Sequence, residues 1–349
     1  MNATIVAVDL AKNIFELAVA GSDWRVTQRQ RLARPRFLSF FVHLAPCEVV
    51  MEACGSAHFW ARRISALGHT VRLLPAHYVK AYVRRNKTDQ ADAGALIEAA
   101  RCAEIREVPV KTVEAQQIQS LHRLRSQWMS TRQRCVNTLR GILREFGFAI
   151  PLGVNVAKAR IGLALTDPDT EIPAALRATL VEMFQQIAVL EDKILTVEHQ
   201  LNALTRTDVR VQQLRQIPGV GALTSTALRA IVGDIQRFPS GRHFASWLGL
   251  TPNERSSAEK RRLGRISKQG DVYLRTLLVH GARSALLAAH RALRAGRPLD
   301  RLRQWALDCE RQRGHNKATV ALANRIARIV WATWKYERPF DGNWSAEAN

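Results

Sequence analysis

The segment Asn86-Lys-Thr-Asp-Gln-Ala-Asp-Ala93 carries two carboxylates, Asp89 and Asp92, at the start of an alanine-rich apolar run that ends at Ala103. This pattern predicts a helix that begins with the acidic pair. Residues three apart share one helix face, so both carboxylates can point toward one ligand. Their mutual repulsion, roughly 1 to 4 kcal/mol, would be removed by a bound divalent cation. An acidic first turn also stabilises a helix through its dipole without any metal. The pair alone therefore leaves open both a metal site and a simple helix start.

The composition indicates a globular protein that binds a polyanion. The 349 residues are enough for two or three domains, and 47% of them are hydrophobic while 23% are charged. Lysine and arginine number 52 against 30 acidic residues, which gives a formal net charge of +22. Such an excess favours nucleic acid as the partner over a membrane surface.

The cysteines and the apolar runs narrow the class further. The five cysteines are scattered and form no CxxC pair, so neither a zinc site nor a disulfide framework is indicated. No basic segment leads into a signal-type apolar run, and no apolar run is long enough to cross a bilayer. We therefore expect a cytoplasmic protein with no membrane partner.

The N-terminal third alternates strand and helix patterns, which predicts an α/β layer. Strand patterns cover residues 4–9, 14–19, 47–52 and 68–75, and a helix pattern covers residues 57–67. Asp9 and Glu52 each stand at the C-terminal end of a predicted strand. In an open α/β sheet, ligands bind beyond those ends.

Four carboxylates are therefore expected to converge, and they come from Asp9, Glu52, Asp89 and Asp92. An all-oxygen set suits Mg²⁺ or Mn²⁺. Two such ions about 3.5–4 Å apart can promote phosphodiester chemistry. A strand-terminal acid is often only a turn or cap residue, but this order of acids in a basic protein favours a metal site.

Three segments carry a resemblance to a known family. They are Val8-Asp-Leu-Ala-Lys12, Val50-Met-Glu-Ala-Cys-Gly-Ser56 and Lys87-Thr-Asp-Gln-Ala-Asp-Ala93. The N-terminal third resembles an RNase H-like (RuvC-like) domain, and nearly the whole chain resembles the DEDD transposases of bacterial insertion sequences. Relatives in that group include a pilin-gene invertase and bridge-RNA-guided recombinases. The resemblance implies that the metal-binding, catalytic quartet is Asp9, Glu52, Asp89 and Asp92.

The middle of the chain predicts two long amphipathic helices, at residues 112–146 and 174–205, joined by a loop region at residues 148–173. Such helices should form an antiparallel coiled-coil hairpin that acts as a spacer or an oligomerisation arm. The arginine-rich first helix could also lie along a nucleic acid backbone. The resemblance implies that this element links two functional domains and supports assembly.

The C-terminal third begins with a turn typical of a helix-hairpin-helix motif, Gln216-Ile-Pro-Gly-Val-Gly-Ala-Leu-Thr224. Gly219 and Gly221 allow a tight turn whose N–H groups can face a phosphate. Contact of this kind would bind DNA without reading its sequence. The glycines could instead serve only to reverse the chain between two helices.

The most basic stretch surrounds two serines, Ser256 and Ser257. Its cations, all expected to bind nucleic acid, are Arg255, Lys260, Arg261, Arg262, Arg265 and Lys268. A serine attacks phosphorus only if its proton is removed and the developing charge is stabilised, and these cations could meet the second need. Composition alone favours a phosphate-binding loop whose serines are solvated. The resemblance implies that Ser257 is the nucleophile, which forms a 5′-phosphoserine link to DNA. Ala258 stands where the family usually has glycine.

The predicted organisation joins an α/β domain to an all-α part. It comprises an RNase H-like metal-binding domain (1–108), a coiled-coil spacer (109–207), an all-helical domain with the helix-hairpin-helix motif and the serine (208–336), and a tail (337–349). The predicted function is that of a Mg²⁺-dependent DNA transposase acting on element ends and target DNA. The resemblance further implies a structured bridge RNA as guide and a homo-oligomer, a dimer or tetramer.

Three other functions fit part of the pattern. A hydrolytic RuvC-like nuclease, such as a junction resolvase, would use the same carboxylates and would not need Ser257. A non-catalytic nucleic-acid-binding protein would tolerate loss of the carboxylates. An actin-like sugar kinase also begins with a strand ending in an acid, but it needs glycine-rich phosphate loops, and the residues after Asp9 supply none.

Overall fold

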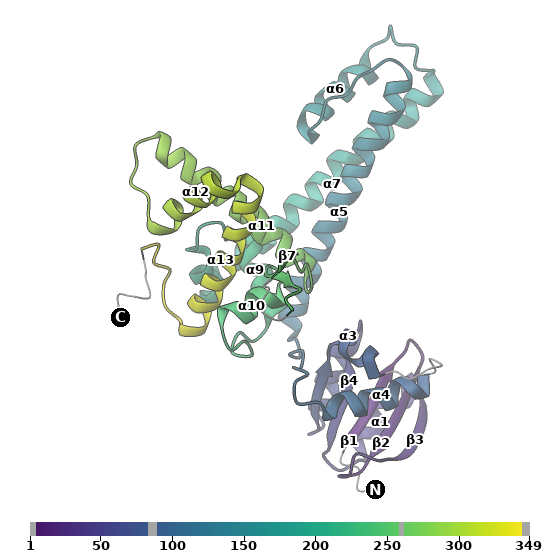
Figure 1. Ribbon diagram of the computed structural model, residues 1–349. Helices are drawn as coiled ribbons and strands as arrows, with labels where there is room; N and C mark the ends of the chain where they lie inside the picture. The colour runs from purple at the N-terminus through teal and green to yellow at the C-terminus, as the bar shows by residue number, and fades with distance from the viewer. Residues whose placement is uncertain (1–4, 83–88, 258–261, 344–349) are drawn as a thin grey trace. The chain divides into compact units, whose positions relative to one another are not determined.

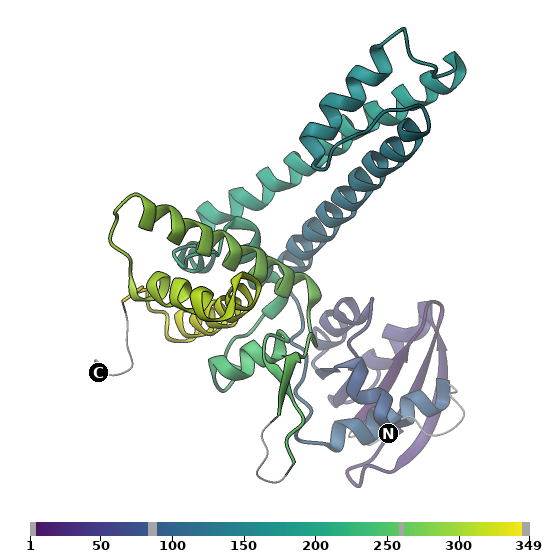
Figure 2. The same ribbon diagram turned by 45° about the horizontal axis from the view of Figure 1, so that its top comes forward.

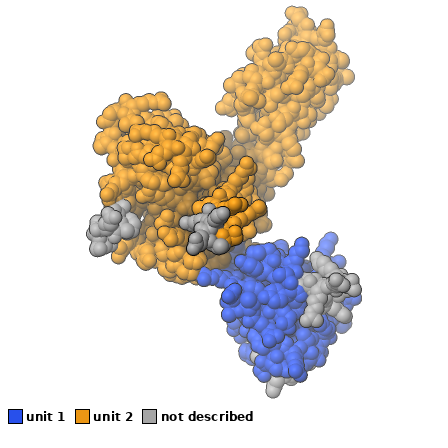
Figure 3. Space-filling model, viewed as in Figure 1, with its two compact units in different colours: residues 1–113 blue, residues 114–349 orange. Residues whose placement is uncertain are grey.

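The computed structural model describes residues 5–82, 89–257 and 262–343, except for the side chains of residues 89–91. The chain divides into two compact units, residues 1–113 and 114–349 (Figure 3). The first contains the predicted α/β domain, and the second contains the predicted spacer together with the C-terminal helices.

Unit 1 is built on a mixed sheet whose five strands lie in the order β3-β2-β1-β4-β5. The strands are β1 (Ile5–Leu10), β2 (Ile14–Ala20), β3 (Val26–Ala33), β4 (Glu48–Glu52) and β5 (Thr70–Leu74). β1 pairs antiparallel with β2 and parallel with β4; β2 pairs antiparallel with β3, and β4 pairs parallel with β5. The sequence did not predict β3, which carries the basic residues that follow the first hairpin.

The two faces of the sheet are covered by different helices. Helices α1 (Phe37–Val42) and α2 (Ala57–Ser65) pack with Val6, Val8 and Met51 on one face. Helix α4 (Asp89–Arg101) packs on the other face with Ile5, Ala7 and Val50 (Figure 1). The short helix α3 (Ala76–Val79) follows β5. Because side chains alternate along a strand, these partners fix which face every strand residue occupies.

Unit 2 begins with two long helices that run antiparallel, α5 (Val113–Glu145) and α7 (Ala174–Thr207) (Figure 2). Arg125 Nη2 lies 2.6 Å from Glu198 Oε1, and Arg132 Nη1 lies 3.7 Å from Glu191 Oε1, so the ion pairs step in opposite directions along the two helices. The connection was expected to be a loop, but it contains helix α6 (Val154–Thr166). This helix packs in one apolar cluster with residues of α5 and α7.

The rest of unit 2 is a helical core that carries one small hairpin. Its elements are α8 (Val209–Arg215), α9 (Ala222–Val232), α10 (Gly241–Trp247), β6 (Pro252–Glu254), β7 (Leu263–Ile266), α11 (Val272–Arg294), α12 (Arg301–Arg313) and α13 (His315–Tyr336). Phe244, Leu278 and Ile326 are fully buried at its centre. The prediction of an all-helical domain is therefore wrong in one respect, because β6 and β7 pair antiparallel across the most basic stretch.

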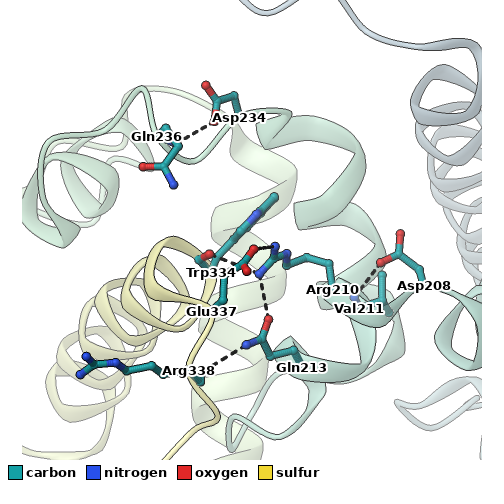
Figure 4. A network of polar contacts seen from close by, with 9 residues as sticks. All are labelled: Asp208, Arg210, Val211, Gln213, Asp234, Gln236, Trp334, Glu337 and Arg338. Atoms are coloured by element: carbon teal, nitrogen blue, oxygen red, sulfur yellow. Dashed lines mark hydrogen bonds and ion pairs between the residues drawn. The ribbon is translucent and has the colours of Figure 1, made fainter.

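The end of α13 is tied to α8 by a polar network (Figure 4). The Arg210 guanidinium forms an ion pair with Glu337 and donates to the Trp334 carbonyl oxygen at 3.3 Å. The Gln213 side-chain amide donates to the Arg338 carbonyl oxygen at 3.3 Å. The tail expected from residue 337 onward thus begins with residues bonded to the helical core. In the described part of the chain, every helix is too short or too polar to span a membrane.

A buried histidine fixes α5 to the helical core. His122 is 2% exposed; its Nδ1 lies 2.8 Å from Tyr273 Oη in α11, and its Nε2 lies 3.1 Å from Thr226 Oγ1 in α9. Since the Thr226 hydroxyl donates to the Ala222 carbonyl oxygen, it accepts from Nε2–H, and the tyrosine hydroxyl donates to Nδ1. Burial, and to a lesser extent Arg125, lowers the pKa of His122 to about 4, so the ring is neutral.

This network predicts a pH-dependent stability. The folded pKa of about 4 lies below the ordinary value of 6.5, so unfolding takes up a proton between these values. The free energy of unfolding therefore falls as the pH drops from 6.5 to about 4, and His122 contributes about 3 kcal/mol to that loss. Urea unfolding at neutral pH and near pH 4 should show this loss in the wild type and a smaller one in His122→Gln. Identical pH dependence in the two proteins would contradict a neutral buried ring.

The turn between α8 and α9 packs backbone against backbone on α11. Gly219 has a φ of +85°, and a Cβ there would lie 2.5 Å from the carbonyl oxygen of Gly281. A Cβ on Gly281 would lie 1.9 Å from the carbonyl oxygen of Gly219. Gly219 therefore needs glycine for both conformation and packing, whereas Gly281 needs it for packing alone.

Two helix-interior glycines provide a matched test of this packing. Gly281 lies in α11 against Gly219, whereas a Cβ at Gly141 in α5 would meet nothing within 4 Å. We expect Gly281→Ala to lower the free energy of unfolding by about 1–3 kcal/mol through overpacking. Gly141→Ala should raise it by about 0.5–1 kcal/mol through helix propensity. The midpoints of urea unfolding measure both, and a stabilising Gly281→Ala would refute the close approach.

Candidate functional site

Asp9 and Glu52 lie on neighbouring strands at the same edge of the sheet. The parallel register pairs Val8 of β1 with Met51 of β4, so the two acids each come one residue later. Ala7 and Val50 face α4, and alternation therefore places Asp9 and Glu52 on that face too. Both acidic residues are partly exposed.

Helix α4, which carries Asp89 and Asp92, packs across β1, β2 and β4 on this same face of the sheet. Its backbone starts at Asp89, whose side chain lies outside the described residues. Asp92 is half-buried, and its Oδ1 is fully buried with no hydrogen-bond partner among the described residues. A buried carboxylate oxygen without a partner costs about 1–3 kcal/mol or more, and a bound cation would remove that cost.

The residues present fit a hard divalent cation in their chemistry. Asp9, Glu52 and Asp92 offer only carboxylate oxygens, which Mg²⁺ and Mn²⁺ prefer, and the unpaired Asp92 oxygen is ready to accept a ligand. Among the described side chains, which exclude Asp89, no three acidic, histidine or cysteine residues come close enough to bind one ion. The fold places the strand acids and the helix that carries Asp89 and Asp92 on one face of the sheet, but the described side chains do not form a metal centre.

Sequence reasoning missed a fourth acidic residue on this face. Glu16 of β2 lies directly opposite Asp9 in the antiparallel register and is only 8% exposed. Arg31 of β3 pairs with it at 2.7 Å. Arg29, two residues earlier, places its guanidinium 3.4 Å from the Cβ position of Gly94 in α4. Alternation within residues 14–20 could have revealed Glu16, whereas the arginines required knowledge of β3.

The two candidate serines differ in their hydrogen bonds. The Ser256 hydroxyl donates to Glu254 Oε1 at 2.7 Å and accepts from the Arg262 backbone N–H at 3.1 Å. It therefore braces the β6–β7 hairpin. Ser257 is exposed, and its hydroxyl forms no hydrogen bond with a described residue.

The base of the hairpin is held by a buried cation. Arg275 in α11 is 8% exposed and donates to the carbonyl oxygens of Leu248 and Gln269 at 3.0 and 2.7 Å. Gly270 has a φ of +73° and packs against the Trp247 carbonyl oxygen. These contacts fix where the hairpin leaves the helical core.

The basic residues expected to bind nucleic acid fall into two groups. Arg255, Arg262, Arg265 and Lys268 are exposed on or beside the hairpin, whereas Lys260 and Arg261 lie outside the described residues. In the helix-hairpin-helix turn, Gly221 is exposed and begins α9, while Gly219 packs against α11 as described above. Packing alone accounts for Gly219, so any phosphate contact of this turn would come from its exposed Gly221 side.

Comparison with protein families gives two matches. Residues 211–296 match a profile described as the transposase IS116/IS110/IS902 family. Residues 6–148 match a second transposase profile, that of the DEDD transposases of IS110. The first covers the turn and the hairpin with Ser257, and the second covers all four carboxylates.

Individual proteins match over almost the full length. A probable family 20 transposase of Pseudomonas aeruginosa is 40% identical over 95% of this chain and 97% of its own length. The transposase for insertion sequence element IS1111A of Coxiella burnetii is 35% identical over 94% and 88% of the two chains. A pilin gene-inverting protein of Moraxella lacunata is 27% identical over 43% and 46%.

We call Asp9, Glu52 and Asp92 together the acidic edge, and we predict that it binds divalent cations through these carboxylates. In a Mn²⁺ titration followed by electron paramagnetic resonance, Asp9→Asn and Asp92→Asn should weaken binding about tenfold or more, because each removes a charged ligand. Glu98→Gln is the matched control, since Glu98 lies on the same helix, is exposed and pairs only with Arg101 at 3.1 Å among the described contacts. Binding that survives Asp9→Asn and Asp92→Asn unchanged would disprove this site.

Proposed function

Because this chain belongs to the IS116/IS110/IS902 family of transposases, we propose that it cuts and rejoins the DNA of an insertion sequence through a serine nucleophile, with Mg²⁺ at an RNase H-like carboxylate site. Membership of the family confirms the resemblance found in the sequence and makes the chain an enzyme that acts on DNA. The proposal is supported by the two acidic strand ends, which lie on the face of the sheet that α4, the helix with Asp89 and Asp92, covers.

The carboxylates have a defined role in this proposal. Asp9, Glu52, Asp89 and Asp92 would hold one or two divalent ions, which when bound supply charge stabilisation to the attacking and leaving oxygens. The protein itself fixes the acids through the parallel pairing of β1 with β4 and the packing of α4. Glu16, neutralised by Arg31, adds no net charge to this edge.

The proposed covalent step uses Ser257. Its Oγ attacks the phosphorus of a DNA phosphodiester and loses its proton to a base, while the bond from phosphorus to the 3′ oxygen breaks. The 3′ oxygen takes up a proton and leaves as a hydroxyl, and the 5′ phosphate remains on Ser257. A 3′ hydroxyl from another strand then attacks this phosphoserine and releases the serine, so rejoining needs no ATP. Arg255 and Arg262 are placed to stabilise the negative charge on the phosphate.

The proposal requires the two compact units to act together. The carboxylates belong to residues 1–113 and Ser257 belongs to residues 114–349. A complete site therefore forms by meeting of the units, within one chain or between subunits. Oligomerisation through α5 and α7 is supported by exposed apolar side chains, with Leu124, Val189 and Leu195 each 45–52% exposed. Guidance by a structured bridge RNA rests on the family resemblance and agrees with the net charge of +22.

A suicide-substrate assay tests the chemistry. With Mg²⁺, end DNA of the element and its flanking non-coding RNA, we expect a covalent protein–DNA adduct on a denaturing gel. Ser257→Ala and Asp9→Ala should abolish it, because one removes the nucleophile and the other a metal ligand. Ser256→Ala should reduce the adduct without abolishing it, because Ser256 only braces the hairpin.

The same gel separates the rival functions. Metal-dependent cleavage with no adduct and no effect of Ser257→Ala would leave a hydrolytic nuclease. Binding of DNA with neither cleavage nor adduct would leave a non-catalytic binding protein. An adduct lost in Ser256→Ala and kept in Ser257→Ala would move the nucleophile to Ser256.

A further inference from the structure

Unit 2 contains a large groove that the proposed chemistry does not use. It has a volume of about 2180 Å³ and lies between one face of α13, the start of α12, the base of the β6–β7 hairpin and residues 338–342. We call it the C-terminal groove. All of its lining residues belong to unit 2, so its shape does not depend on how the two units meet.

The C-terminal groove is strongly basic. Among the described residues, nine arginines or lysines line it against a single acid, Asp341. None of the nine cations forms an ion pair with a described side chain. Burial, and then Arg328, lowers the pKa of Arg325, so a bound anion would relieve unfavourable charge there. A groove of this kind attracts a polyanion.

The floor of the same groove is apolar and aromatic. Leu250, Ile266 and Ile329 contribute aliphatic surface, and Trp305 and Tyr336 contribute rings. The Arg325 guanidinium carbon lies 4.4 Å from the Trp305 ring centroid, and Tyr336 is 57% exposed. Duplex DNA presents only its charged backbone and groove edges to such a surface. Unpaired bases instead stack on aromatic rings and guanidinium planes while their phosphates meet the cations.

The groove leads to the proposed nucleophile. Pro252, Arg265 and Ile266, at the base of the hairpin, form part of its wall. Ser257 lies five residues beyond Pro252 on the same hairpin, a distance of at most about 17 Å in an extended strand. A strand bound in the groove can therefore present its next phosphates to Ser257.

We infer that the C-terminal groove binds single-stranded DNA adjacent to the phosphodiester that Ser257 attacks. This inference rests on the proposed function for the location of the cut, and on the charge and apolar floor of the groove for the form of the ligand. Strand exchange requires the cut strand to leave its complement and be held until it is rejoined. The groove offers cations for its backbone and rings for its exposed bases.

The test measures binding of labelled oligonucleotides to the full-length protein by fluorescence anisotropy. The probes are a thymidine strand of about 15 nucleotides, a DNA duplex and a uridine strand of the same length. Lys317→Gln with Arg328→Gln should weaken binding of the DNA strand about tenfold. It should also lower the slope of log K against log salt by about 1.4, since two phosphate contacts are lost.

Two further variants make the result specific. Arg283→Gln with Arg294→Gln removes the same charge from exposed positions of α11 outside the groove, and should change affinity less than about twofold. Tyr336→Ala should weaken binding of the DNA strand about fivefold or more through lost stacking, while duplex binding stays constant. Tyr336 is 57% exposed and meets the core through an edge-on contact with Trp331, so the circular dichroism spectrum and urea midpoint of the variant should stay close to those of the wild type.

Specific results would overturn the inference. Equal effects of the groove pair and the control pair would reduce the groove to general electrostatics. A larger loss for the duplex, or for the RNA strand, would assign the groove to that ligand instead. Ser257→Ala should bind the DNA strand with wild-type affinity. If the wild type forms no adduct while the groove variants lose strand binding, the serine chemistry is wrong and the groove inference stands. If the wild type forms the adduct while the groove variants bind the strand normally, the serine chemistry stands and the groove inference is wrong.

Discussion

The acidic edge of unit 1 depends on one constraint, the parallel pairing of β1 with β4. This pairing brings the C-terminal ends of the two strands together. Because side chains alternate along a strand, Asp9 and Glu52 then point to the same face of the sheet. The apolar side chains of α4 cover that same face, so the helix that carries Asp92 packs on the side of the sheet to which both strand acids point. A shift of one residue in the register of either strand would turn its acid to the α1/α2 face and separate it from the other acid and from α4.

The sequence predicted the elements whose apolar periodicity is strong, and missed those that depend on partners. Strands β1, β4 and β5 and helices α4, α5 and α7 bury continuous or regularly spaced apolar residues, so their patterns were sufficient. β3 is an edge strand with mostly exposed polar residues, and only its pairing with β2 makes it a strand. α6 is short and packs on α7. Its apolar residues lie on several sides of the helix, so they form no single stripe that would have predicted it. The β6–β7 hairpin has almost no buried side chains, so no hydrophobic pattern could reveal it.

The candidate site shows the same limit at the level of single residues. The sequence indicated four acids and two serines by type and spacing, but it could not distinguish two adjacent serines. The difference appears only when the chain folds, because the Ser256 hydroxyl is used by Glu254 and by the Arg262 backbone. Glu16 was missed for a related reason. Its burial depends on Arg31 from a strand that the sequence did not predict.

The division of the residues between two units has a chemical consequence. A serine near bound metal ions at all times would attack any phosphodiester that reached it, and breaks in DNA would follow. With the carboxylates in one unit and Ser257 in the other, neither unit alone can perform the proposed step. The helical part of unit 2 is held to α5 in part by His122, which is neutral and therefore adds no buried charge of its own. Assembly on DNA would then be the event that completes the site, and binding would control cutting.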